Sequence, residues 1–179
     1  GTNIVIEQNL IHNVDLGIEL ASEHKGRTSS FIIARNNVIH NGNSAGISIG
    51  GYAKGRGGAD HCQVVGNTLY NNDSQKTGSG EFQIQFNATN NVFENNILYA
   101  GPQNLLVNDF TTSSPDPALV DYNLYYAAAG ANKAQFKWQK HLYKTYASYL
   151  TGSGNDADSP PFSDPQFVDA PANLNIGAG

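Results

Sequence analysis

Four basic residues occupy matching places in two polar, glycine-containing segments of the sequence. The first segment, 21–27, contains Lys25 and Arg27, and the second, 50–61, contains Lys54 and Arg56. The two lysines are 29 residues apart, and so are the two arginines. If the chain repeats with this period, the four side chains lie close together, and like charges held together require a bound anion or nearby carboxylates. The pattern predicts a site for an acidic ligand.

Such a site suits the cleavage of an acidic polysaccharide by β-elimination. This reaction removes the proton beside a uronate carboxylate, so it needs a base and a cation that stabilises the resulting carboxylate-enolate. Lys54 or Lys25 would be the base, with a pKa lowered by the neighbouring cations. Arg56 or Arg27 would form a bidentate pair with the uronate carboxylate.

Other side chains of the two segments have supporting roles in this hypothesis. His61 and His24 are alternative proton carriers near neutral pH. Tyr52 would stack on a sugar ring or protonate the leaving oxygen. In the opposing interpretation, these glycine-rich loops expose solvated charges that Glu23, Asp60 and Asp73 balance.

A glycoside hydrolase is the second hypothesis. It needs two carboxyl groups about 5–10 Å apart across the sugar. Glu19 is the candidate for one of them, with Glu23, Asp60 or Glu81 as its possible partner and the pair with Asp60 as the first choice. In later repeats the positions that correspond to Glu19 are Ser48, Gln85 and Leu106, so no second carboxylate stacks on Glu19, and Gln85 is expected to contact the substrate.

The two segments contain no D-x-D cluster. A calcium-assisted lyase needs several acidic oxygens in one place. We therefore expect no metal site and no cofactor, with calcium as the one ion worth considering.

An asparagine recurs along the chain, and it identifies the elements that position these loops. Each aligned asparagine is preceded and followed by short segments in which apolar and polar residues alternate, which is the pattern of β-strands with one buried face. The intervals between the asparagines are 27 to 30 residues, and the five aligned positions are Asn9, Asn37, Asn67, Asn96 and Asn123.

A repeat made of strands without a helix buries its apolar face by stacking on its neighbours, which predicts a parallel β-solenoid. Each repeat has three short strands, and the long loop of each repeat lies along one edge. At an inward bend, an asparagine amide donates to one neighbouring coil and accepts from the other, so that the five side chains form a ladder.

The repeated segments resemble those of the pectate-lyase-like superfamily. The resemblance lies in the pattern N-x-[IL]-[HY] followed by G-I-x-[LI], over roughly residues 3 to 126. The segment 162–169, with the sequence F-S-D-P-Q-F-V-D, is similar to the terminal coil of secreted bacterial β-helix proteins. The resemblance implies an all-β, right-handed single-stranded parallel β-helix. It also implies a secreted, extracellular, carbohydrate-active protein whose partner is a polysaccharide, in a superfamily of lyases, hydrolases, epimerases and non-catalytic fibres.

We expect a single domain over residues 1–179, with about five coils over 3–126, an insertion over 127–161 and a terminal coil over 162–179. Trp138, Leu142, Tyr146 and Tyr149 recur at helical spacing, which predicts a short helix over 139–150. Since a solenoid needs a polar cap, we expect the chain to be a piece of a longer one, with its open first coil covered by another protomer or by further residues.

Composition excludes several classes of protein. The chain has 10 Lys and Arg against 15 Asp and Glu, a net charge of −5, which argues against general nucleic-acid binding. It has no apolar run near the roughly 18 residues of a membrane span. The third hypothesis, a non-catalytic glycan-binding or structural rod, depends on an outward column of rings three residues after each ladder asparagine: His12, His40, Tyr70, Tyr99 and Tyr126.

Overall fold

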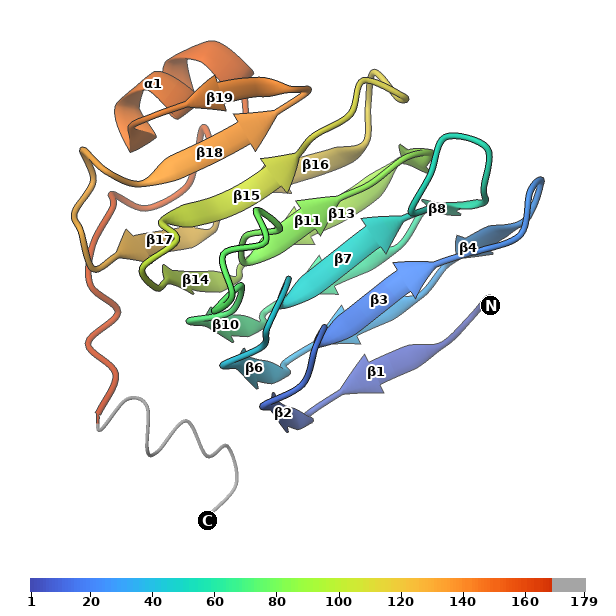
Figure 1. Ribbon diagram of the computed structural model, residues 1–179, viewed down its shortest axis with the longest axis horizontal. Helices are drawn as coiled ribbons and strands as arrows, with labels where there is room; N and C mark the ends of the chain where they lie inside the picture. The colour runs from blue at the N-terminus through green and yellow to red at the C-terminus, as the bar shows by residue number, and fades with distance from the viewer. Residues whose placement is uncertain (169–179) are drawn as a thin grey trace.

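The computed structural model describes residues 1–168, and these residues form a parallel β-solenoid of about five turns with one short helix (Figure 1). The predicted all-β solenoid is confirmed. Strands β1 to β4 lie at one end of the stack, and the helix α1 lies at the other (Figure 1).

Four sheets run along the stack, and successive turns pair in parallel with the same register. The first sheet contains β1 (Val5–Glu7), β5 (Ile33–Arg35), β9 (Gln63–Val65), β13 (Asn91–Glu94) and β16 (Ala118–Asp121). The second contains β2 (Leu10–His12), β6 (Val38–His40), β10 (Thr68–Tyr70), β14 (Ile97–Ala100) and β17 (Leu124–Ala127).

The third sheet contains β3 (Ile18–Ala21), β7 (Ile47–Gly50), β11 (Phe82–Ile84), β15 (Leu105–Asp109), β18 (Gln135–Trp138) and the antiparallel β19 (His141–Tyr143). The fourth contains β4 (Thr28–Ser30), β8 (Gly58–Asp60) and β12 (Ala88–Thr89). The first three turns therefore have four strands rather than the predicted three, because short strands of small and polar residues lack the β-branched and aromatic pattern that marks a strand in a sequence.

The asparagine ladder lies at the bend between the first and second sheets, as predicted. In the middle of the stack, Asn37 donates through its backbone N–H and its Nδ2 to the Oδ1 of Asn67, at 3.0 and 2.9 Å. Asn67 donates in the same way to Asn96, at 2.9 and 3.1 Å. Each interior amide also donates to a strand carbonyl, such as that of Ala34 for Asn67. The amides satisfy one another without water, so the bend can be buried.

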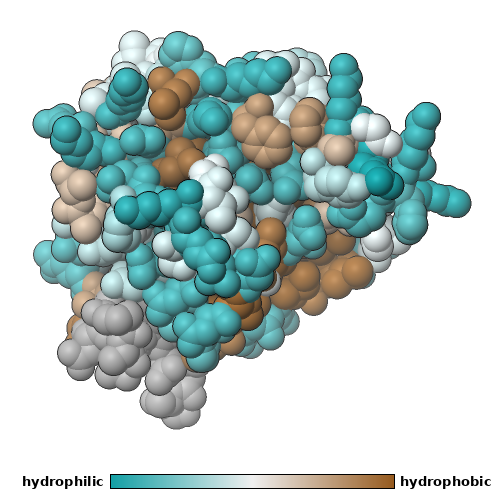
Figure 2. Space-filling view, in the orientation of Figure 1, coloured by the Kyte–Doolittle hydropathy of each residue, from teal (hydrophilic) through white to brown (hydrophobic). Residues whose placement is uncertain are grey.

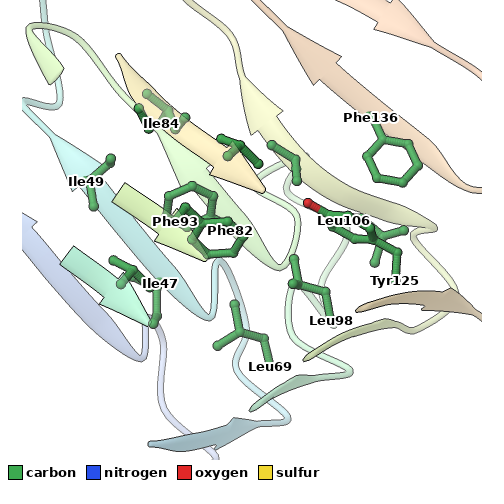
Figure 3. Packing of buried hydrophobic residues seen from close by; sticks show 14 of the residues in the cluster. Ile47, Ile49, Leu69, Phe82, Ile84, Phe93, Leu98, Leu106, Tyr125 and Phe136 are labelled. Atoms are coloured by element: carbon green, nitrogen blue, oxygen red, sulfur yellow. The ribbon is translucent and has the colours of Figure 1, made fainter. Parts of the chain in front are cut away.

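Inward side chains of the sheets fill the interior between them (Figure 3). Leu69 and Leu98 are neighbours in the second sheet, and Phe82 of the third stacks on Phe93 of the first with ring centroids 3.7 Å apart. Burying such a side chain contributes roughly 1.5–3 kcal/mol. The core therefore stabilises every turn, and the loops between strands are free to differ.

At the end that carries the helix, a buried carboxylate closes the ladder. Asp156 accepts from the Nδ2 of Asn123 at 3.3 Å, and from the hydroxyls of Tyr125 and Tyr149 at 3.0 and 2.9 Å. Ser159 accepts from the backbone N–H of Asn123 at 2.8 Å. These groups take the place of a further asparagine and cap the last turn.

The segment predicted as a helix is a hairpin followed by a helix. Strands β18 and β19 are joined by a two-residue turn in which Gln139 and Lys140 have positive φ, and β18 extends the third sheet beyond the predicted coils. Helix α1 (Tyr146–Ser153) begins after the N-cap Thr145. Residues 162–168 contain no strand, and the rest of the predicted terminal coil, 169–179, lies outside the described residues.

Candidate functional site

The predicted basic loops are two turns of similar sequence on adjacent coils. Residues 24–27 and 53–56 both end in Lys-Gly-Arg, and both are closed by the same backbone hydrogen bond, from Arg27 to the carbonyl of His24 at 3.0 Å and from Arg56 to that of Ala53 at 2.9 Å. We call them the Lys-Gly-Arg turns. The 29-residue spacing predicted this stacking, because β3 and β7, which precede the turns, pair with that offset.

Hydrogen bonds hold the two turns together at their base. The N–H of Gly58 donates to the carbonyl of Arg27 at 3.2 Å. Asn87, from the next coil, directs its Nδ2 at the carbonyls of Lys54, Arg56 and Gly57, at 3.4, 3.3 and 3.1 Å. Neighbouring coils thus fix the backbone of the second turn, a role of Asn87 that no sequence motif indicated.

The four cationic side chains are exposed, and among residues 1–168 none of them forms an ion pair. The guanidinium of Arg56 lies over the ring of the exposed Tyr52, 5.0 Å from its centroid. Hydrophilic side chains project from the edge where the β3–β4 and β7–β8 loops lie (Figure 2). The arrangement offers an anion several donors at the surface.

Carboxylates lie at the foot of the first turn. Glu19 projects from the outer face of β3, where burial and the nearby Glu23 raise its pKa. Neither carboxylate forms an ion pair with Lys25 or Arg27 within the described ranges. The carboxyl neighbour of Glu19 is therefore Glu23 and not Asp60.

The register of the third sheet corrects two positions that were aligned with Glu19. Ser48 pairs with Gln83, not Gln85, and Leu106 is buried in the core at a β-bulge. Gln85 lies just beyond the end of β11 and donates its Nε2 to the Oε1 of Gln83 at 3.1 Å. The outer positions opposite Glu19 are Ser48, Gln83 and Asn108, which are neutral.

Asp60 and His61 form a separate pair at the bend between the fourth and first sheets, at the opposite end of β8 from the turns. Their Oδ2 and Nδ1 are 2.7 Å apart, and Asp60 also accepts from Thr89 and Asn90. The hydrogen bond from His61 and those from Asn90 and Thr89 lower the pKa of Asp60. The structure therefore does not bring His61 or Asp60 to the basic cluster, whereas His24 lies in the first turn and is exposed.

In the column of outward rings on the second sheet, rings of neighbouring coils pack against one another. The rings of His12 and His40 are nearly parallel, with centroids 5.0 Å apart, and Tyr70 and Tyr99 follow at 4.7 Å. Phe167 packs against Tyr70 and Tyr99, with centroids 5.8 and 6.3 Å away. Phe167 thus covers part of the column of rings on which the hypothesis of a glycan-binding or structural rod depends.

The buried carboxyl group of Glu81 has a structural role and does not belong to the basic cluster. Glu81 is fully buried, and its oxygens accept from the N–H and Nδ2 of Asn72 and from the Nε2 of Gln103. Burial raises its pKa to about 8. Asn72 in turn accepts from the N–H of Gly42, so these groups form a second, shorter ladder between the second and third sheets. Glu81 is out of reach of a polysaccharide.

In the part of the chain that the structure describes, no group of three or more His, Cys, Asp and Glu side chains is arranged to hold a metal ion. The described helix is also too short to cross a membrane.

Comparison with known proteins gives one informative match. No protein-family model and no solved structure matches the chain. The chain is 36% identical over 170 residues to "Uncharacterized protein YwoF" of Bacillus subtilis (strain 168), a match that covers 94% of this chain and 36% of that protein. The chain therefore spans about a third of the length of this relative, whose name states no activity.

Proposed function

We propose that the protein binds an acidic polysaccharide outside the cell, through the edge formed by the two Lys-Gly-Arg turns. The observation that carries the proposal is the duplication, on adjacent coils, of an exposed turn whose two cations form no ion pair within residues 1–168. Coils of a parallel solenoid lie about 4.8 Å apart, so the two turns present their cations a short distance from each other. A polyuronate carries a carboxylate on each sugar residue, so one polymer can contact both turns.

The chemistry of the side chains favours carboxylates over other partners. Arginine binds a carboxylate through two parallel N–H donors, and lysine adds a mobile charge. Tyr52, beneath the guanidinium of Arg56, offers a ring face to a sugar. The chain carries a net charge of −5, so attraction of a polyanion depends on local groups of cations such as the two turns.

Cleavage of the bound polysaccharide by β-elimination is a second candidate function. The contact of Tyr52 with Arg56 supports it, because a phenol beside a guanidinium supplies a proton donor next to the cation that would stabilise a carboxylate-enolate. The resemblance of the repeats to the pectate-lyase-like superfamily supports the same proposal.

Binding is tested with charge-matched variants. The double variants Lys54→Ala with Arg56→Ala, and Lys25→Ala with Arg27→Ala, each remove two positive charges from one turn. The control, Lys133→Ala with Lys144→Ala, removes two exposed lysines elsewhere. Calorimetric titration with polygalacturonate at low salt should show at least a tenfold weaker affinity for each turn variant, which corresponds to about 1.4 kcal/mol.

The control variant should bind polygalacturonate as tightly as the unaltered protein, and 0.5 M salt should weaken binding, because exposed charges are screened. Equal losses in the turn and control variants would show that only net charge matters and would refute the site. Cleavage is followed separately, through the absorbance of unsaturated uronates. Binding without that absorbance would support the binding function and would exclude β-elimination of that polymer.

A further inference from the structure

A pocket of about 480 Å³ lies on the outer side of the first sheet, far in sequence from the Lys-Gly-Arg turns. It is lined by the β12–β13 connection, by the loop that leads into β16, by the end of β18 and by the residues that follow α1. Its volume lies in the range of roughly 300–1,000 Å³ that is usual for sites of small ligands.

One side of the pocket is apolar. Val92 and Leu119 are paired neighbours on β13 and β16, and Leu119 is 59% exposed. The indole of Trp138 lines the pocket beside them. An exposed leucine next to an indole offers a flat apolar surface that water solvates poorly.

The polar side of the pocket has one carboxylate that the described part of the protein leaves free. Asn155 also lines this side, but a ligand does not reach its Nδ2, because that atom is buried and the amide interacts with the hydroxyl of Tyr149. Asp116, which is exposed at the rim, forms no side-chain hydrogen bond or ion pair with the described residues, and the lining contains no basic side chain.

The walls of the pocket are held in place before any ligand binds. Gln139, in the turn after Trp138, donates its Nε2 to the carbonyl of Pro115 at 2.8 Å and its N–H to Asp109 at 3.1 Å. On the other side, the N–H of Asn155 donates to the hydroxyl of Ser153 at 3.1 Å. Little conformational entropy is therefore lost on binding.

We propose that this pocket binds a neutral sugar residue of a glycan. A pyranose has an apolar face, which suits Trp138, and a rim of hydroxyls that both donate and accept hydrogen bonds. Asp116 accepts from such hydroxyls. A uronate is disfavoured, because Asp116 repels its carboxylate and no cation compensates. The pocket and the Lys-Gly-Arg turns thus select opposite classes of sugar.

The test uses the fluorescence of Trp138, the single tryptophan of the chain. The protein is titrated with hexaoses of glucose, xylose and mannose, with hexagalacturonate, and with adenosine as a planar ligand that is not a sugar. At least one neutral hexaose should change the emission saturably, and hexagalacturonate should leave it unchanged.

Variants identify the contacts. Asp116→Ala should weaken the binding of the neutral hexaose about tenfold, the loss expected for one hydrogen bond to a charged group. The control, Asp15→Ala, removes an exposed carboxylate elsewhere and should leave the affinity unchanged. Both aspartates are exposed, so both variants should keep the thermal melting of the unaltered protein.

The proposal is overturned if no neutral hexaose saturates the signal, or if adenosine alone does. It is also overturned if Asp116→Ala binds the hexaose as tightly as the unaltered protein. A change in affinity in the Lys54→Ala and Arg56→Ala double variant would likewise contradict it, because the two sites share no residue.

Discussion

Replacing Asn67 by alanine tests whether the buried amide ladder stabilises the solenoid. Asn67 is 1% exposed and takes part in four ladder hydrogen bonds through its side chain: two accepted from Asn37, one donated to Ala34 and one donated to Asn96. The substitution leaves the backbone N–H of Asn37 buried without its acceptor. A buried unsatisfied group costs roughly 1–3 kcal/mol, and the three weakened partners add to this, so the free energy of unfolding should fall by about 3 kcal/mol.

The matched control is the same substitution at the open end of the same ladder. Asn9 is exposed, and its side chain donates to Glu7 and Asn37 at sites that water reaches. Asn37 still accepts the backbone N–H of Asn9 after the change. Asn9→Ala should therefore cost about 0.5 kcal/mol, the low end of the net contribution of a hydrogen bond.

Urea unfolding followed by circular dichroism measures both values. The slopes of the free energy against denaturant must agree among the variants, because repeat proteins can lose cooperative unfolding. Asn67→Asp adds a second check, since its new oxygen faces the carbonyl of Ala34 instead of donating to it, and it should cost at least as much as Asn67→Ala. Equal losses for Asn9→Ala and Asn67→Ala would refute the ladder as a source of stability.

Three further predictions follow from buried groups and close contacts. Asp156→Ala leaves two buried tyrosine hydroxyls without their acceptor, so amide hydrogen exchange should speed up in the last turn more than in the first. Burial raises the pKa of Glu81 from 4.5 to about 8, so the folded protein keeps a proton that the unfolded chain loses. Stability should fall as pH rises from about 5 to about 8, and less steeply in Glu81→Gln, as measured by denaturation at each pH. A Cβ on Gly57 would lie 2.3 Å from the carbonyl oxygen of Arg27, so Gly57→Ala should displace the turns and weaken binding of polygalacturonate in calorimetric titration without a change of charge. Gly55→Ala, which meets nothing within 4 Å, should not.

The ladder and the inward face were predictable because both recur with the period of the coil. An amide ladder requires the same residue at the same bend of each turn, and the five asparagines meet this requirement. The inward positions of the first two sheets were found for the same reason. A period in the sequence is the direct consequence of a stacked repeat.

Features that do not share the period were missed. The loop between β10 and β11 lengthens the third turn, so that Ser48 meets Gln83, 35 residues away, and the period of 27 to 30 residues does not identify this partner. This loop folds around Asp73, which accepts from Thr77 and from two glycine N–H groups. Its length is a property of that local structure and not of the coil.

The helix was predicted to begin at 139 rather than 146, because Trp138 and Leu142 of the hairpin of β18 and β19 fall at helical spacing with Tyr146 and Tyr149 of α1. Gln139 and Lys140 adopt positive φ, which ends a helix but is favoured in a two-residue hairpin turn. The pocket beside Trp138 was not predictable, since Trp138, Ser153 and Asn155, which form part of its walls, lie outside the repeated segments.

The repeated Lys-Gly-Arg sequence needs an explanation that the fold does not supply. Asparagines recur because the bend is buried, whereas the lysines and arginines of the turns are exposed and satisfy no buried group. Exposed like charges repel one another by up to about 1 kcal/mol in water, so stacking them brings no gain in stability. Packing requires glycine at Gly51, Gly57 and Gly58, where an added Cβ would clash with neighbouring backbone, but it requires no basic side chain in the turns. A bound anion reverses the sign of the electrostatic energy, and this gives a physical reason for placing two such turns side by side.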